Sequence, residues 1–444
     1  MKQEQNKLLS EIINTEGLEY AVYTVENRAI PSMIDGLKPV QRFFLYSALQ
    51  TANGKFNKVA SIGGRVSELG YHHGEVSACE AGILMTANYC NNIPLLDGDG
   101  AFGSRFIRQA AASRYIFAKI SENFNKIYKD INLSPVHEDS EHIPPKYYLP
   151  LIPFVLINGA KGIATGFATN ILPYDYESIR NNVIEYIKTG NITNNPKVKF
   201  YDFKGDISSY TKEVNNKVVK GVILSGIYKL SGFTLTITEL PYNTEREEYI
   251  ALLDKLEEQG KIISYSEEIS SSKVNIIIKL KRDFLSTNDE QNHQKILKEF
   301  KLQESVAENI TVLDQNNKLK VYENANDLIK DFVDFRMPFI QKRIDENIRI
   351  ENEKHRLASA KIIFIKKIIN KEIVLDKLSR KDSLKLIESY NELKDYSEDL
   401  INMKLYHLTI DEVKKLEKQQ EDIKKSLDYW KNTTAKKEYL NDLK

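Results

Sequence analysis

One short stretch of the sequence, residues 100–120 (GAFGSRFIRQAAASRYIFAKI), joins cations to a hydroxyl in a way that suits phosphate chemistry. It contains no acidic residue, and its cations are Arg105, Arg108, Arg114 and Lys119. Tyr115 directly follows Arg114, and a phenol beside a guanidinium suits attack on a phosphodiester, with tyrosine as the nucleophile and arginine holding the phosphate oxygens. The chain has 24 tyrosines, most of which must be packing residues, so the pair alone leaves packing as the simpler interpretation of Tyr115.

Several further motifs resemble, in the same order, those of the type IIA DNA topoisomerases. The matching stretches are RAIPSMIDGLKPVQR (residues 28–42), YHHGE (71–75), LLDGDGAFGS (95–104), AASRY (111–115) and NGAKGIATGFATNILP (158–173). Each motif is modestly specific by itself, but the full set in one order is not expected by chance. The resemblance covers essentially the whole chain and is closest to the breakage–reunion subunit of bacterial gyrase and topoisomerase IV.

The resemblance implies roles for particular residues. Tyr115 becomes joined to the 5′ end of a cut DNA strand, and Arg114 stabilises the charge at the phosphate. The predicted DNA contacts are Arg28, Lys38, Arg42, His72, His73, Arg105, Arg108 and Ile171. Ile171 matches an apolar residue that wedges between base pairs and kinks DNA. The alternatives are solvated surface cations, loop histidines and a core isoleucine.

Two departures from the family pattern bear on these roles. The family commonly has histidine where this chain has Gln41. It also has HPHGD where this chain has the shorter YHHGE, so His73 matches the histidine before glycine and His72 matches less securely. Adjacent histidines point in different directions, which disfavours a shared metal.

The composition is that of an ordinary globular protein with limited charge excess. A net charge of +1 over 444 residues is low for a nucleic-acid binder, so binding would depend on a local cationic surface. Cys79 and Cys90 form no CxxC pair. The polar N-terminus and the lack of a long apolar run favour a cytoplasmic protein without a membrane span.

The resemblance implies a multidomain α/β (α+β) fold. Its predicted parts are an N-terminal helical arm (1–27), a winged-helix breakage–reunion domain with the tyrosine (28–175), an α/β tower domain (176–325), and a long antiparallel coiled coil (326–444) with a globular dimerisation tip near 373–408.

Residue patterns predict individual elements in the first two-thirds of the chain. Helices are expected at residues 6–26, from Pro39 onward, at 77–88 with Ile83 and Leu84 facing inward, at 176–187 and at 245–259. The arm at 6–26, with Leu8, Leu9, Ile12 and Ile13 on one side, is either a packing helix or a contact with a partner. Lys38 and the helix that follows it predict an anion site. Alternation of apolar and polar residues predicts strands at 233–238 and 274–280.

The last third of the sequence predicts long helices. A charged helix spans residues 326–369 and should kink at its interior Pro338. A second helix begins near Thr409, which forms a capping box with Glu412. Its apolar seam contains Val413, Leu416, Gln420, Ile423, Leu427 and Trp430.

Cofactors and partners follow from the resemblance and from motifs that the sequence lacks. The sequence has no GxxxxGK[ST] loop and no DxDxD cluster. The resemblance therefore implies that Mg²⁺ and ATP are bound by TOPRIM- and ATPase-bearing partner subunits, while two copies of this chain meet across double-stranded DNA. The expected activity is relaxation and decatenation without negative supercoiling, because no wrapping domain follows the last helix. A non-catalytic DNA-binding coiled-coil scaffold is the alternative, and it leaves AASRY unexplained.

Overall fold

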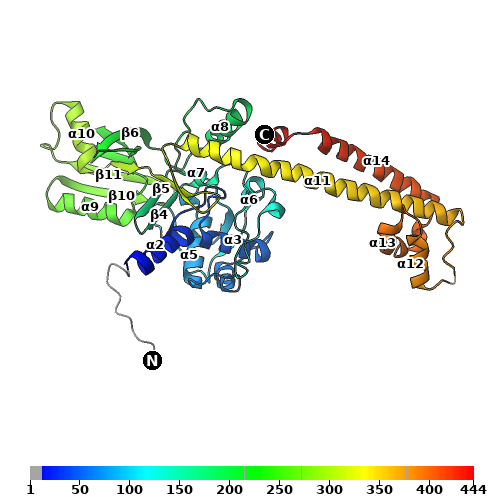
Figure 1. Ribbon diagram of the computed structural model, residues 1–444. Coiled ribbons are helices and arrows are strands. Elements are labelled where there is room, and N and C mark those ends of the chain that lie inside the picture. The colour runs from blue at the N-terminus through cyan, green and yellow to red at the C-terminus, as the bar shows by residue number, and fades with distance from the viewer. Residues whose placement is uncertain (1–12, 215, 272, 377) are drawn as a thin grey trace. The chain divides into compact units, whose positions relative to one another are not determined.

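The structure is a computed structural model that describes residues 13–444 except residues 215, 272 and 377. The chain divides into two compact units, Met1–Asp334 and Phe335–Lys444. The first unit mixes helices and strands, whereas the described part of the second is helical (Figure 1). Among the described residues, none of the helices combines the length and apolar character that crossing a membrane would require.

The first described segment is a helical arm. It consists of η1 (Ile13–Gly17), α2 (Leu18–Thr24) and η2 (Val25–Ala29), so helix continues slightly beyond the predicted end. Leu8, Leu9 and Ile12 lie outside the described residues, and Ile13 is 59% exposed. The arm also exposes the apolar side chains of Leu18, Tyr20 and Val22.

A group of helices surrounds a three-stranded antiparallel sheet in the next segment. The strands β1 (Asn57–Lys58), β2 (Leu96–Asp99) and β3 (Phe117–Ile120) have the order β1-β3-β2. The helical elements are α3 (Pro39–Thr51), α4 (Val59–Gly64), η3 (Arg65–Ser67), α5 (Glu75–Thr86) and η4 (Asn88–Cys90). This sheet brings both ends of the tyrosine-bearing loop together, because β2 and β3 flank it.

The inward face of α5 differs from the prediction. Leu84 is 52% exposed, and the buried positions are held by Ala78, Cys79, Gly82, Met85 and Thr86 instead. A Cβ atom on Gly82 would lie 2.2 Å from the ring of Phe44 in α3, so α5 has no room for a side chain where it packs against that ring. The prediction that Leu84 faces inward is therefore wrong.

Two hairpins and several short helices make up the rest of this part of the first unit, and one hairpin lies beyond residue 307 in the sequence. These elements are α6 (Glu122–Ile127), η5 (Ile131–Leu133), α7 (Phe154–Asn158), β4 (Ala160–Ala164), β5 (Phe167–Ile171), α8 (Tyr176–Thr189), β13 (Ile310–Leu313) and β14 (Leu319–Tyr322). Strands β4 and β5 form one hairpin, and β13 and β14 form the other. Asp175 caps α8 by accepting from the backbone N–H of Ser178 at 3.1 Å, and the predicted helix there is confirmed.

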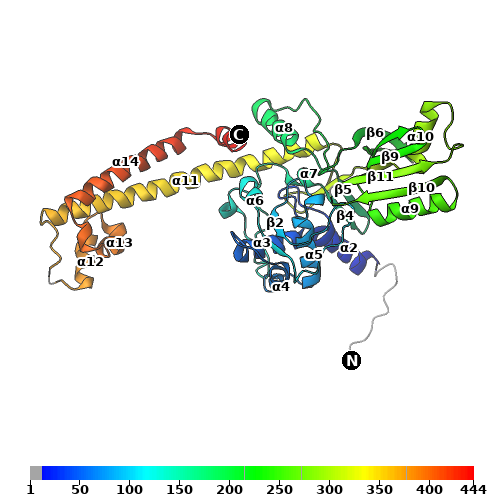
Figure 2. The same ribbon diagram turned by 180° about the vertical axis from the view of Figure 1, so that it is seen from behind.

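Residues 206–307 form a strand-rich lobe with two sheets. One has the order β12-β7-β6, from β12 (Gln303–Ala307), β7 (Lys217–Ser225) and β6 (Asp206–Val214). The other has the order β10-β11-β9-β8, from β10 (Ile262–Ile269), β11 (Val274–Leu280), β9 (Thr234–Glu239) and β8 (Ile227–Ser231). Helices α9 (Arg246–Glu258) and α10 (Asp289–Glu299) contribute to its core, and α9 lies beside β10 in both views (Figures 1 and 2). The strands predicted at 233–238 and 274–280 are confirmed within a residue of their ends.

The second unit contains a pair of antiparallel helices. Helix α11 (Ala325–Ile369), which carries Pro338, spans the division between the units, and α14 (Ile410–Asn432) packs beside its C-terminal part. Lys366 pairs with Glu417 at 2.8 Å, and Gln420 donates to Ser359, which fixes the antiparallel direction. Along the predicted seam Val413, Leu416 and Leu427 are buried and Gln420, Ile423 and Trp430 are half-buried. Thr409 accepts from the N–H of Glu412, as predicted.

A small core lies between these two helices in the sequence. The elements are α12 (Arg380–Glu388), η6 (Lys394–Tyr396), α13 (Ser397–Ile401) and η7 (Leu405–His407), and α15 (Ala435–Asp442) follows α14. Ile373, Ile387, Leu393 and Leu400 are buried against Phe364 of α11. Several apolar side chains in this segment and at the start of α14 are exposed, namely Val374, Leu378, Tyr406 and Ile410.

Candidate DNA-cleavage site

The loop between β2 and β3 presents Tyr115. Its base is closed by the pairing of Asp99 with Phe117. The start of α4 holds the last part of the loop, because the N–H of Val59 donates to Ile116 and the N–H of Ala60 to Ser113, at 3.0 and 3.1 Å. The loop therefore leaves the sheet and returns to it at fixed points.

Tyr115 and Arg114 lie at the surface of this loop. The N–H of Tyr115 donates to the carbonyl of Ala112 at 2.8 Å, which closes a tight turn. The Tyr115 side chain is 67% exposed, and Arg114 is also exposed, with its guanidinium carbon 4.8 Å from the tyrosine ring centre. Both groups can thus reach one phosphate from solvent, which is the arrangement that nucleophilic attack and charge stabilisation require.

His73 lies in an aromatic setting next to Arg28. Its ring contacts those of Tyr71 and Tyr23 at centroid distances of 5.3 and 5.7 Å, and its Nε2 atom is hydrogen-bonded to the Tyr23 hydroxyl. Burial, followed by the charges of Arg28 and His72, lowers the pKa of His73 below its ordinary value. The ring is therefore neutral at neutral pH and can donate one hydrogen bond to an acceptor such as phosphate.

The other two predicted residues of this region are also exposed. Arg28 is exposed at the end of the arm. His72 is 69% exposed in its side chain and lies 3.7 Å from Glu141. The structure thus brings Arg28 and His73 together, while His72 is turned toward an acid.

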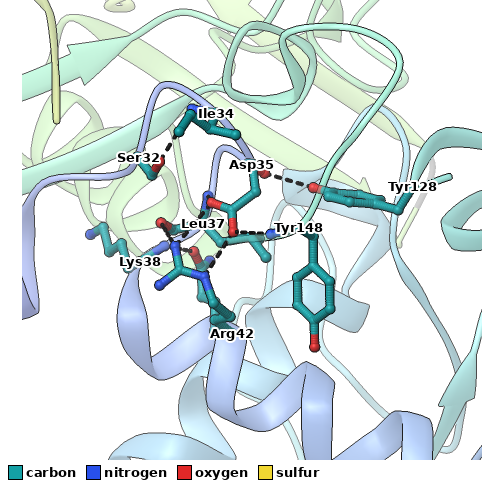
Figure 3. Close-up of polar contacts among 9 residues, drawn as sticks. Ser32, Ile34, Asp35, Leu37, Lys38, Arg42, Tyr128 and Tyr148 are labelled. Atoms are coloured by element: carbon teal, nitrogen blue, oxygen red, sulfur yellow. Dashed lines mark hydrogen bonds and ion pairs between the residues drawn. The ribbon is translucent and has the colours of Figure 1, made fainter. Parts of the chain in front are cut away.

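The turn before α3 uses its charged groups internally (Figure 3). Arg42 donates to Asp35 through Nε at 2.7 Å and through Nη2 at 3.0 Å. Asp35 is 0% exposed and also accepts from the N–H groups of Leu37 and Tyr148, both at 3.1 Å. The Arg42 side chain is only 12% exposed and holds this turn, so its contact with DNA stays a prediction.

The same turn explains Gln41. The Gln41 side-chain oxygen accepts from the N–H of Lys38 at 2.9 Å, which caps the start of α3. The Lys38 ammonium donates to the carbonyl of Lys161 at 2.6 Å, and burial lowers the pKa of Lys38. Lys38 therefore lies at the predicted helix start, and its ammonium group already makes one hydrogen bond to the β4–β5 hairpin.

Arg105 and Arg108 have different surroundings although they lie in the same stretch. Arg105 is 6% exposed and pairs with the buried carboxylate of Glu239 in the strand-rich lobe. Arg108 has a 36% exposed side chain and lies 3.7 Å from Glu245. Arg105 is thus engaged within the protein, whereas Arg108 stays accessible, and the contacts of both with DNA stay predictions.

Ile171 is placed in the protein interior, at 2% exposure. Its neighbours are held by residues 307–309: the backbones of Asn170 and Asn309 exchange hydrogen bonds at 3.0 and 2.9 Å. Glu308 accepts from the N–H of Leu172 at 3.2 Å and from the Tyr174 hydroxyl at 2.8 Å. This is the placement of a core isoleucine, and insertion into DNA would require the end of β5 to move.

A cavity of about 390 Å³ connects several of these motifs. Its lining includes Lys38, Leu84, Arg105, Arg108 and Ile171. Burial raises the pKa of Cys90, which also lines it, to about 11, so that thiol stays protonated and unreactive at neutral pH. Motifs far apart in the sequence thus meet at one hollow of the first unit.

A divalent metal in a protein is usually held by several His, Cys, Asp or Glu side chains. No group of three or more His, Cys, Asp or Glu among residues 13–444, apart from the gaps already given, could hold one. Asp97 of the DGDG run lies 3.7 Å from Lys119. The carboxylate of Asp97 is therefore already paired with a cation of this chain.

Sequence reasoning missed Tyr23, Gln41 and Glu239. Gln41 carried a signal, since a glutamine three residues after a turn can cap a helix start. Tyr23 and Glu239 carried none, because their partners are 50 and 134 residues away.

Several known proteins are similar to this chain. The family model that describes the A subunit of DNA gyrase/topoisomerase IV matches residues 28–444. The DNA topoisomerase medium subunit of Enterobacteria phage T4 is 46% identical over 444 residues, covering 99% of this chain and 98% of that protein. DNA topoisomerase 2 of Plasmodium falciparum is 30% identical over 98% of this chain, which spans only 34% of that larger protein. The crystal structure of the Plasmodium falciparum topoisomerase II DNA-binding, cleavage and re-ligation domain is similar with a TM-score of 0.84 and 29% identity, covering 98% of this chain and 63% of that one.

Proposed function

Because the chain belongs to the family of DNA gyrase/topoisomerase IV A subunits, we propose that it is the DNA-cleaving and religating subunit of an ATP-dependent type II DNA topoisomerase. The observation that carries the proposal is the exposed Tyr115 beside Arg114 on a loop with two fixed ends. A winged-helix domain, a tower domain and a coiled coil are the proposed parts that surround this site.

The proposed reaction exchanges one phosphate ester for another. The Tyr115 oxygen attacks the phosphorus, the bond from phosphorus to the 3′ oxygen breaks, and the 5′ end of the strand becomes a tyrosyl ester. The phenol loses its proton to solvent and the released 3′ oxygen takes one up. Arg114 holds the non-bridging oxygens as their charge develops. Because the ester bond is conserved, the reverse attack religates the strand without ATP.

The proposed DNA contacts are the accessible groups around this site. Arg28 and Arg108 offer cations, and the neutral His73 offers one ring N–H. Lys38 lies at the start of α3, where the helix N-terminus also favours an anion. Contacts of this kind go mostly to phosphate, so we expect affinity to fall steeply with salt.

Magnesium and ATP are proposed to reach the complex on partner subunits that carry TOPRIM and ATPase domains. A divalent ion supplies charge stabilisation at the scissile phosphate. The exposed apolar side chains of the arm, which include Leu18 and Val22, support a contact between the arm and such a partner.

A homodimer is proposed because cutting both strands requires two tyrosines. The exposed apolar side chains of the tip, which include Val374, Leu378 and Tyr406, support a contact between two copies there. The isolated chain should therefore dimerise and bind DNA, and it should not cut DNA with Mg²⁺ alone. Stoichiometric breaks by the pure chain would contradict the assignment of the metal to a partner.

The deciding experiment traps the covalent intermediate. The reconstituted enzyme is mixed with end-labelled duplex and Mg²⁺ and then denatured, and protein attached to 5′ DNA ends is measured. Tyr115→Phe removes only a hydroxyl and should abolish the attachment while DNA binding persists. Tyr429→Phe, which alters another exposed tyrosine in the other unit, should leave the attachment at the wild-type level. Covalent complexes in Tyr115→Phe, or their absence in the wild type, would contradict the proposal.

A further inference from the structure

The loop that precedes Tyr115 is anchored in the strand-rich lobe. Phe106 is 4% exposed and belongs to the lobe's core cluster, which also contains Leu235 and Ile237 of β9. The N–H of Arg246, the first residue of α9, donates to the carbonyl of Phe106 at 3.0 Å. The middle of the loop is therefore part of the interior of the lobe and does not lie free on the surface.

Arg105 adds a buried ion pair to this anchor. Its guanidinium bonds the carboxylate of Glu239 and the carbonyl of Leu240, the latter at 3.2 Å, and lies 4.3 Å from the ring centre of Phe106. Glu239 is 4% exposed and accepts further from the N–H groups of Leu240 and Lys204, at 2.9 and 3.2 Å. The carboxylate and guanidinium thus pair away from water, while the Nε atom of Arg105 is buried without a hydrogen-bond partner among the described residues.

A tight turn connects this anchor to the tyrosine. Gly103 has a φ of +83°, and a Cβ atom there would lie 2.8 Å from the carbonyl oxygen of Arg108. The N–H of Ser104 donates to the carbonyl of Ile107 at 2.8 Å. After the turn, Ser113 is held by α4, as described above. The two anchors bracket the segment 107–112, which connects Arg105 to the turn that carries Tyr115.

We infer that Arg105 is a positioning residue for DNA cleavage: through its ion pair with Glu239, the strand-rich lobe sets where Tyr115 meets the scissile phosphate. The inference rests on the proposed function. Because the guanidinium is turned into the protein, it adds nothing to the cations that bind DNA. Cleavage and DNA affinity should therefore respond separately to its loss, which they would not do if Arg105 contacted phosphate.

The test uses the reconstituted enzyme with Arg105→Gln and Glu239→Gln. The rate of covalent-complex formation is measured in a single turnover at saturating enzyme, and DNA affinity is measured by fluorescence anisotropy over a series of salt concentrations. We expect each variant to cleave about 10 to 100 times more slowly, the effect of a small misplacement of a reacting group. The slope of log affinity against log salt concentration should stay unchanged, because no phosphate contact is lost.

The double variant and a conservative variant sharpen the result. Arg105→Gln combined with Glu239→Gln should lose no more than either change alone, since both remove the same interaction. Arg105→Lys keeps the cation and loses the planar fork, so it should recover part of the rate. If Arg105→Gln does not fold, judged by circular dichroism, Arg105→Lys carries the test with a smaller loss of rate at unchanged affinity.

Two outcomes overturn the inference. Wild-type cleavage rates in the folded variants would show that the ion pair does not position the loop. A salt slope reduced by about 0.9 in Arg105→Gln would show that the arginine contacts a phosphate. Failure of the proposed function would look different, because then the wild-type enzyme would form no covalent complex, or Tyr115→Phe would still form one.

Discussion

Two turns of the first unit, one from Asp35 to Arg42 and the other from Ser113 to Tyr115, use their arginines in opposite ways. In the turn from Asp35 to Arg42, the guanidinium binds a fully buried carboxylate and two backbone N–H groups complete that carboxylate's bonding. In the turn from Ser113 to Tyr115, arginine and tyrosine both point to solvent. The first arrangement fixes the backbone and the second leaves a cation available to a phosphate.

Local sequence therefore does not reveal which cations are free to bind DNA. The stretch 100–120 contains no acid, yet Arg105 finds one in Glu239, 134 residues later. Arg114 lies in the same stretch and stays exposed. A cation is therefore available to DNA only when folding brings no buried carboxylate to it.

The largest expected effect outside the tyrosine is on stability, from Arg42→Ala. The change leaves the Asp35 carboxylate buried with its backbone donors only, and breaking a buried pair costs about 3–5 kcal/mol. The free energy of unfolding is measured in urea by circular dichroism. Trp430, the only tryptophan, lies in the second unit and reports unfolding there. The midpoint of the transition followed by fluorescence should therefore shift less than the midpoint followed by circular dichroism.

Arg65→Ala is the matched control for Arg42→Ala. Arg65 is 38% exposed and lies 3.8 Å from an exposed Glu68. Loss of such a surface pair should change the free energy of unfolding by less than about 1 kcal/mol. Equal effects of the two substitutions would remove the distinction between the two turns.

A smaller expected effect is on rate, from Arg114→Gln. Loss of one preorganised donor at a developing charge should lower the rate of cleavage by about 100-fold. The free energy of unfolding should change by less than about 0.5 kcal/mol, because the side chain is exposed. Single-turnover formation of the covalent complex gives the rate, and urea unfolding gives the stability. The cleavage rate of Arg114→Lys should fall between those of the wild type and Arg114→Gln. A destabilised Arg114→Gln that cleaves at the normal rate would contradict the difference between the two turns.

Elements with a strong local pattern could be predicted from the sequence. The alternation in Val274–Leu280 matches β11 at both ends, and the seam residues of α14 are buried or half-buried. Thr409 caps its helix as its type and spacing indicate. In each case the information lies within a few turns of helix or one strand, where the periodicity of burial decides the structure.

Features that depend on distant backbones could not be predicted in this way. Leu84 is exposed although its side chain is apolar, and α5 packs instead through Gly82, which lies against the ring of Phe44 in α3. Ile171 is inside because residues 307–309 hold the end of β5. Arg42 is an intermediate case, because its partner Asp35 is only seven residues away in the sequence. The ion pair could have been predicted from that spacing, but the resemblance pointed to a contact with DNA.

The smallest expected effect is on DNA affinity, from Arg28→Gln. Arg28 is exposed, so its loss should remove about one phosphate contact and lower the slope of log affinity against log salt by about 0.9. The charge of Arg28 also lowers the pKa of His73, so that pKa should rise in the variant when followed by NMR. Lys425→Gln is the control, because Lys425 lies on α14 and pairs with Glu421 at 3.0 Å. An unchanged slope with a raised His73 pKa would mean that Arg28 acts on the histidine and does not bind DNA.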